Sequence, residues 1–218
     1  MTDTSANLSL NEVEQLCLKA ARGAGMSWGL AEEAGFAASW LAERGLDGPG
    51  SLLRLLEADQ PVDRLVMVLA HWRSAGAGSL CPITVGAALC DFALLPEAAM
   101  ADAGLRVGPV RQGVLLLPFL SVLAALRGRM VRLEWSGGQV VVEGNGAVSG
   151  AATLLAEEAA PVDLTLQLAG TDGPAPTCAL PPVKAATLAG LNRLALRTTV
   201  PPSTLSRRDA GAEVDDND

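Results

Sequence analysis

Apolar residues recur at helical spacing in two segments near the start of the chain. Residues 9–22 carry an apolar stripe, and Ser9 with Glu12 has the spacing of a capping box. A second stripe, in residues 27–44, begins at a serine suited to the N-cap and ends before a glycine. Glycines separate the two stripes. The pattern predicts an N-terminal helical hairpin.

The segments that follow the hairpin are shorter and less regular. Residues 47–50 (Asp-Gly-Pro-Gly) have turn chemistry, and the leucines behind them predict a short helix that ends before Pro61. Residues 65–72 and 82–95 are apolar over short runs. Periodicity does not separate a buried strand from a helix at this length, so both interpretations stay open for the two runs.

The clearest strand pattern lies in the second half of the chain. Residues 131–135 and 139–143 alternate around Ser-Gly-Gly, which predicts a β-hairpin, and residues 163–168 alternate as a third strand. Residues 114–117 have a β-like composition, and residues 119–126 look helical. These patterns predict a central sheet.

A last helix is predicted over residues 182–197, so helices gather at the two ends of the chain and strands in the middle. The regular alternation that marks a doubly wound parallel sheet is missing. We therefore predict an α+β fold with an N-terminal helical hairpin, a central, mostly antiparallel sheet, a C-terminal helix and an acidic tail. Residues 1–208 are expected to form a single domain, followed by the tail at 209–218.

Composition narrows the function classes. Half of the 218 residues are hydrophobic, which suffices for one core. The net charge is −8, and the last ten residues hold five acids and no base, which leaves 19 acids against 16 bases elsewhere. This balance disfavours attraction to phosphate backbones and anionic membranes. We expect neither nucleic acid nor a membrane among the partners.

Targeting signals and metal-binding patterns are also missing from the sequence. Residues 1–10 lack the features of a signal peptide, and the longest apolar run, 114–126, is shorter than the roughly 20 residues of a membrane span. The four cysteines are scattered without a CxxC pair, which favours reduced, packed thiols and predicts no metal site. A cytoplasmic location is expected. The cysteines are Cys17, Cys81, Cys90 and Cys178.

His71 is the single histidine, so a metal centre built from several histidines is excluded. As a general base it needs a nucleophile and an orienting acid, and no local motif supplies them. A packed or partly exposed structural histidine is the alternative. No phosphate-binding glycine motif is present either.

Two polar segments could form a site. In the first, Arg22 and Trp28 lie close to the start of the second predicted helix, where backbone N–H groups and a guanidinium could hold an anion. Glu33 or Glu32 would then be the general base, with His71 in reserve. The alternative is structural: the glutamates complement the helix dipole, and Trp28 staples the hairpin.

The second polar segment lies at the C-terminus. Arg197, Arg207 and Arg208 could recognise an anion, and the carboxylates of residues 215–218 suit Mg²⁺ or Ca²⁺. A solvated tail is the alternative. If both segments serve one ligand, they should converge on one pocket.

These segments also carry a family resemblance. The runs ARGAGMSWGLAEEAG at 21–35, VPPSTLSRRDAG at 200–211 and the terminal DDND resemble an uncharacterised bacterial family of about this length. The resemblance covers nearly the whole chain and implies no established activity or cofactor. The tail of that family is richer in glycine, and Asp209 and Glu213 depart from it.

A fainter likeness concerns residues 43–48 (Glu-Arg-Gly-Leu-Asp-Gly), which resemble the start of the malate and lactate dehydrogenases that lack a Rossmann fold. That family has Ser-His-Gly where this chain has Gly-Pro-Gly at 48–50, and this chain is shorter, which argues against hydride transfer.

Two functions remain open at this point. The first is an enzyme, or an accessory subunit of a bacterial metabolic enzyme, that binds a small anionic metabolite. The second is a non-catalytic interaction or assembly module, as a homo-oligomer or with a partner subunit. The sequence specifies no cofactor.

Overall fold

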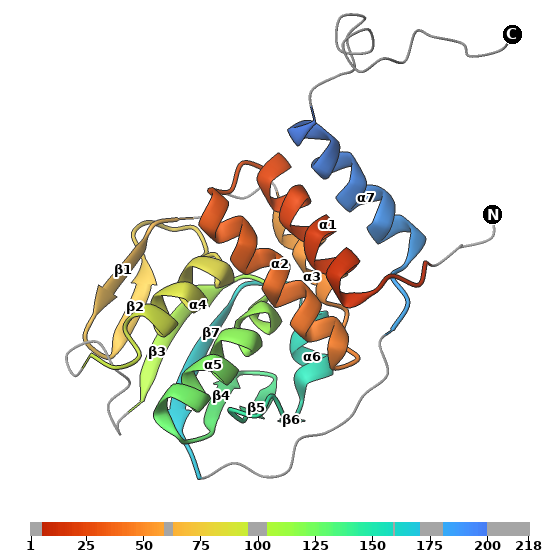
Figure 1. Cartoon of the computed structure of the whole chain (residues 1–218). Coiled ribbons are helices and arrows are strands. Elements are labelled where there is room, and N and C mark those ends of the chain that lie inside the picture. The colour runs from red at the N-terminus through yellow and green to blue at the C-terminus, as the bar shows by residue number, and fades with distance from the viewer. Residues whose placement is uncertain (1–5, 59–62, 96–103, 159, 171–180, 200–218) are drawn as a thin grey trace, which may run out of the picture.

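The computed structural model combines one mixed sheet with a layer of helices (Figure 1). The described part of the chain consists of residues 6–58, 63–95, 104–158, 160–170 and 181–199. Within it the helices are α1 (Leu10–Gly23), α2 (Trp28–Glu43), α3 (Gly48–Leu56), α4 (Pro82–Asp91), α5 (Leu117–Arg127), α6 (Ala152–Glu157) and α7 (Ala185–Ala195), with 3-10 helices η1 (Gly113–Leu116) and η2 (Leu196–Thr198).

The strands of the described residues form one seven-stranded sheet in the order β1-β2-β3-β7-β4-β5-β6. Five of the six neighbouring pairs are antiparallel, and β2 pairs with β3 in parallel. The predicted α+β class with a mostly antiparallel sheet is confirmed. The strands are β1 (Leu65–Val68), β2 (His71–Ser74), β3 (Leu105–Val110), β4 (Val131–Trp135), β5 (Gly138–Val142), β6 (Val148–Gly150) and β7 (Val162–Leu168).

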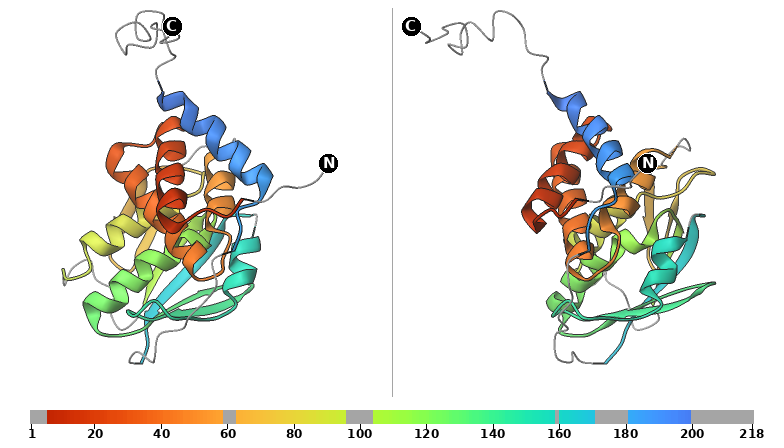
Figure 2. Two further views of the ribbon diagram at one scale, coloured as in Figure 1. Left: turned by 45° about the vertical axis from the view of Figure 1, so that its right-hand side comes forward. Right: turned by 90° about the vertical axis from the view of Figure 1, so that its right-hand side faces the viewer.

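The described helices pack on one face of the sheet, as the turned views show (Figure 2). Side chains therefore divide by strand alternation: Trp72, Val107 and Leu164 point into the core, and their neighbours along each strand point to the other face. In this part of the chain that other face carries mainly polar side chains, and the candidate site lies there.

The predicted helical hairpin is confirmed. The Ser9 hydroxyl accepts a hydrogen bond from the Glu12 N–H at 3.3 Å, and the Glu12 carboxylate accepts one from the Ser9 N–H at 2.8 Å, which completes the capping box. Helix α2 is rich in buried alanine, because it lies between α1 on one side and α4 and α5 on the other. Small side chains let these helices approach closely.

Two expectations about local structure were wrong. Residues 48–50 are not a turn before the helix but its first turn, because the Asp47 carboxylate caps the Gly50 N–H at 2.9 Å and proline is tolerated at this position. Residues 114–117 form η1 and the start of α5 instead of a strand. These four residues are all buried, so their apolar run has no periodicity that distinguishes a helix from a strand.

The two ambiguous runs and the predicted strands are also settled. Residues 65–72 contribute to the β1–β2 hairpin, and residues 82–95 contain α4. The β4–β5 hairpin pairs Trp135 with Gly138 at its turn, and β7 covers the third predicted strand.

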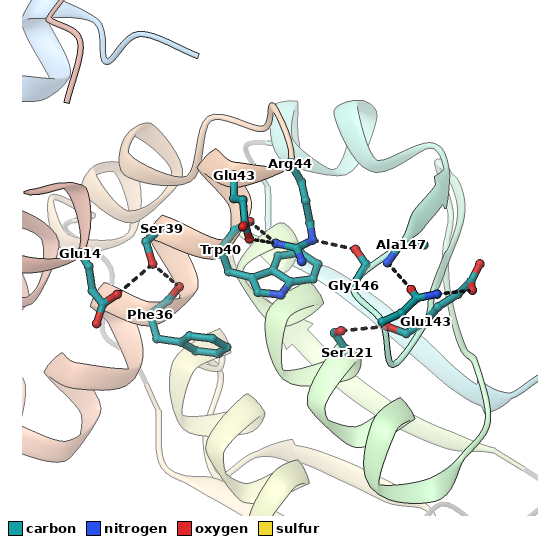
Figure 3. A network of polar contacts seen from close by, with 11 residues as sticks. Glu14, Phe36, Ser39, Trp40, Glu43, Arg44, Ser121, Glu143, Gly146 and Ala147 are labelled. Carbon is teal, nitrogen blue, oxygen red and sulfur yellow. Dashed lines mark hydrogen bonds and ion pairs between the residues drawn. The ribbon is translucent and has the colours of Figure 1, made fainter. Parts of the chain in front are cut away.

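Arg44 joins the helical layer to the sheet (Figure 3). Its guanidinium lies 3.6 Å from the centre of the Trp40 ring, and its Nε donates to the carbonyl of Gly146, in the β5–β6 turn, at 2.7 Å. Ser121 of α5 donates to the Glu143 carbonyl in the same turn at 2.8 Å. Two helices thus fix the position of one sheet turn.

Asp63 organises the glycine-rich loop that follows β2. Its carboxylate accepts hydrogen bonds from the Ser74 hydroxyl, the Gly76 N–H at 3.1 Å and the Gly78 N–H at 2.7 Å. The Ser74 bond is the largest cause that lowers the Asp63 pKa below the ordinary value of 3.8. The loop is therefore held by a charged acceptor.

This arrangement predicts a pH-dependent effect of Asp63→Asn. A carboxylate with a lowered pKa stabilises the fold fully above its ordinary pKa, and this stabilisation is lost as the pH falls through the folded pKa. We expect the variant to melt at a lower temperature than the wild type at pH 7, with the difference shrinking below pH 4. Melting followed by circular dichroism from pH 7 to pH 3 checks this. A constant difference would contradict it.

Candidate functional site

A hollow of about 320 Å³ lies on the sheet face that the described helices leave open. It spans the parallel pair β2–β3 and the neighbouring strand β7. We call it the sheet-face hollow. Its lining residues are His71, Arg106, Val107, Gly108, Asp163, Leu164 and Thr165.

Strand register brings the polar side chains of the hollow together. His71 pairs with Arg106 across β2 and β3, and Arg106 pairs with Thr165 across β3 and β7, so the three residues form one row. The neighbouring row begins with Arg73, which pairs with Gly108. Because residues two apart on a strand share a face, the two rows lie side by side on the outer surface.

Gly108 lets Asp163 pack directly on the backbone of β3. A Cβ atom at this position would lie 2.4 Å from Asp163 Oδ1 and 2.8 Å from the Asp163 Cα, closer than van der Waals contact allows. The β3–β7 register also shifts between Val107 and Val110, which bends the strand beside the hollow. Asp163 therefore takes the place that a side chain at position 108 would occupy, and it forms one wall of the hollow.

The charges around the hollow favour an anionic ligand. Arg106 lines it and Arg73 lies in the neighbouring row, whereas Asp163 is the one carboxylate among the described lining residues. Arginine binds carboxylate and phosphate groups through two parallel N–H donors. A ligand that presents an anionic group to Arg106 can present a hydroxyl or amino group to Asp163.

His71 and Asp163 lie on opposite sides of the hollow. Their strands, β2 and β7, flank β3, so two strand spacings of about 4.8 Å each separate the backbones. His71 and Asp163 therefore do not form the direct histidine–carboxylate pair that is found in catalytic triads. A bound molecule, however, can contact the imidazole and the carboxylate at the same time.

Glu32 and Glu33 lie elsewhere, in a second pocket of about 480 Å³ between α2, α4 and α5. We call it the helical groove. Three carboxylates, those of Glu32, Glu33 and Asp91, line it together with the Cys90 thiol. Its other lining residues are Ser27, Gly29, Leu30, Phe36, Ala87, Phe119 and Val122.

The groove raises the pKa values of Glu33 and Cys90. Partial burial, followed by the charges of Asp91 and Glu32, raises the pKa of Glu33. Burial, with the charges of Glu33 and Asp91, raises the pKa of Cys90 to about 12, so this thiol is not activated as a nucleophile. Cys90 donates instead to the Phe119 carbonyl at 3.6 Å.

Arg22 and Trp28 meet each other rather than the helical groove. The Arg22 guanidinium lies 4.6 Å from the centre of the Trp28 ring, and its Nη1 donates to the Met26 carbonyl. This contact closes the turn between α1 and α2. Neither residue is among those that line the groove, so the proposed cooperation of Arg22 with Glu33 stays a prediction.

The C-terminal candidates are only partly described. Arg197 is exposed on η2, at the end of α7, and the neighbouring Leu194 contacts Gly23 at the end of α1. The two polar segments of the sequence therefore approach each other along the backbone. Arg207, Arg208 and the acidic tail lie outside the described residues, as does Cys178.

Three polar side chains of the hollow, those of Arg106, Asp163 and Thr165, were not singled out from the sequence. Asp163 and Thr165 lie on the polar face of a strand whose alternation was recognised. The polar side chains of that face could have been identified as candidates from the sequence. Arg106 lies on β3, which was not predicted because glycine and proline interrupt its apolar pattern.

Two features are absent from the described residues: a cluster of metal-binding side chains, and a helix that could span a membrane. No group of three or more histidine, cysteine, aspartate or glutamate side chains is placed there to hold a metal ion. Nor does any helix there combine the length and the apolar character that crossing a bilayer demands. Cys17, Cys81 and Cys90 are free thiols.

The fold and site define an α+β protein with helices on one face of a mixed sheet and a polar hollow on the other. Residues 8–103 match the model of the family described as "Protein of unknown function (DUF3726)". This match confirms the predicted resemblance to an uncharacterised family and includes the 21–35 run, but not the C-terminal runs. No curated protein and no solved structure matches the chain.

Proposed function

We propose that the protein binds a small anionic metabolite in the sheet-face hollow, as an enzyme or as the accessory subunit of one. The observation that carries this proposal is the hollow itself, which His71, Arg106 and Thr165 line together with Asp163, whose side chain packs on Gly108. Concave sites with a few converging polar groups are the usual location of small-molecule binding.

Each polar group has a role in this proposal. Arg106 pairs with the carboxylate or phosphate of the ligand, and Thr165, next to it in the same row, donates its hydroxyl. Asp163 accepts a hydrogen bond from a hydroxyl or amino group at the other end of the ligand. His71 exchanges a proton with the ligand if the protein is an enzyme, because an imidazole can act as a general acid or base.

A thermal-shift screen tests the proposal. Mono- and dicarboxylates and phosphate monoesters are compared with primary amines of similar size. A ligand at a hundred times its Kd stabilises the native state by about 2.7 kcal/mol, which raises Tm by roughly 5–10 °C in a protein of this size. We expect at least one anion to raise Tm and the amines to have no such effect.

Two variants on β7 locate the binding. Thr165→Leu fills the hollow with an apolar side chain and should remove most of the shift caused by the anion. Gln167→Leu is the matched control, because Gln167 shares the strand and face but does not line the hollow. The proposal fails if no anion stabilises the protein, or if Thr165→Leu retains the full shift.

A further inference from the structure

The helical groove has an apolar floor and an acidic rim. Leu30, Phe36, Phe119 and Val122 supply the floor, and the two phenylalanine rings meet edge to face with their centres 6.0 Å apart. The rim holds Glu32 and Glu33 from α2 and Asp91 from the end of α4. Among the described lining residues there is no lysine, arginine or histidine.

Exposed apolar side chains extend this surface beyond the pocket itself. Trp28 lies one turn before Glu32 on the same face of α2 and is 65% exposed. On α5, Val122 is 37% exposed, and Leu126, one turn further along the same face, is 46% exposed. The apolar surface is thus longer than the pocket, and a small ligand would leave both of its ends uncovered.

The charges of the rim indicate the sign of the partner. Glu32 and Glu33 lie side by side on α2 and Asp91 lies at the end of α4; after burial, the charges of Asp91 and Glu32 contribute to the raised pKa of Glu33. Positive side chains placed along the rim would relieve the repulsion between these charges and pair with the exposed carboxylates of Glu32 and Asp91 and the half-buried carboxylate of Glu33.

We propose that the helical groove is a docking site for a basic amphipathic helix of a partner protein. Apolar side chains of that helix, spaced three and four residues apart, cover the floor and the exposed Trp28 and Leu126 that lie beyond it, and its lysine or arginine side chains pair with the rim. The proposal does not depend on the sheet-face hollow, because the two sites share no residue.

The probe is an 18-residue model helix of leucine and lysine, with the leucines on one face and a fluorescein label at one end. A second helix carries glutamate at every lysine position. Binding is measured by fluorescence anisotropy with the full-length protein at two salt concentrations. We expect the leucine–lysine helix to bind more weakly at high salt and the leucine–glutamate helix not to bind.

Protein variants separate the groove from general attraction to an acidic chain. The double variant Glu32→Gln/Asp91→Asn removes two rim charges and should weaken binding about tenfold or more. Glu157→Gln/Glu158→Gln removes the same charge from the end of α6, outside the groove, and should change binding less than twofold. Val122→Ser tests the floor and should also weaken binding, because it removes an exposed apolar contact without removing charge.

Several results would overturn this proposal. If both double variants weaken binding equally, the attraction comes from net charge and not from the groove. If the leucine–glutamate helix binds as well as the leucine–lysine helix, the rim does not select positive partners. Hexylamine serves as a small amine for comparison in a thermal-shift measurement. If it raises Tm, if Glu32→Gln/Asp91→Asn abolishes that shift, and if the leucine–lysine helix does not bind, the groove holds a small amine instead of a helix.

Discussion

Gly23→Ala is expected to lower the free energy of unfolding by about 3 kcal/mol. Gly23 is the last residue of α1, where that helix crosses α7, and a Cβ atom there would lie 1.7 Å from the Leu194 carbonyl oxygen. The clash is with backbone, so no side-chain rotation relieves it and α7 has to move away from α1. Urea unfolding followed by circular dichroism measures the change.

Gly29→Ala is the matched control for this variant. Gly29 also lies in a helix, but a Cβ atom at that position meets nothing within 4 Å. The substitution reduces the freedom of the unfolded chain and should leave stability unchanged or raise it slightly. Equal stability of the two variants would show that the approach of α1 to α7 is not as close as described.

Arg106→Gln is expected to have the largest effect on ligand binding, a loss of affinity of about 10- to 100-fold for the anion found by thermal shift. Hydrogen bonds to charged groups contribute about 1.5–3 kcal/mol, and each 1.4 kcal/mol corresponds to a factor of ten. Glutamine keeps the polarity of the side chain and removes its charge at this exposed strand position, so stability should change little. Isothermal titration calorimetry gives the affinity of both proteins.

Arg197→Gln decides between the hollow and the arginines predicted from the C-terminal segment. Arg197 is exposed on η2 and does not line the hollow. If the anion binds at the hollow, this variant retains wild-type affinity. A loss of affinity in Arg197→Gln with none in Arg106→Gln would place the ligand at the end of α7 and reject the hollow.

Local signals explain which parts of the fold were predictable. The capping box of Ser9 and Glu12 and the Ser-Gly-Gly turn of the β4–β5 hairpin are complete within a few residues, and both predictions are confirmed. The run 114–117 was misread because burial on every side removes periodicity. The short elements β6 and α6 contain too few residues to form a pattern.

The hollow was harder to predict, because its residues meet only through sheet order. His71, Arg106 and Thr165 come from three strands widely separated in the sequence, and β7 enters the sheet between β3 and β4. No spacing along the chain encodes that insertion. His71 could therefore be identified as a candidate from the sequence, but Arg106 and Thr165, the residues beside it, could not.

The resonance of His71 offers the most direct test of the anion site. The chain has one histidine, so a single histidine Cε1–H signal is expected in a proton NMR spectrum. This signal can be assigned to His71 without a variant. Titration with the anion found by thermal shift should move this signal along a saturating curve in the wild type, and much higher anion concentrations should be needed in Arg106→Gln. A signal that stays in place while the anion raises Tm would contradict binding at the sheet-face hollow.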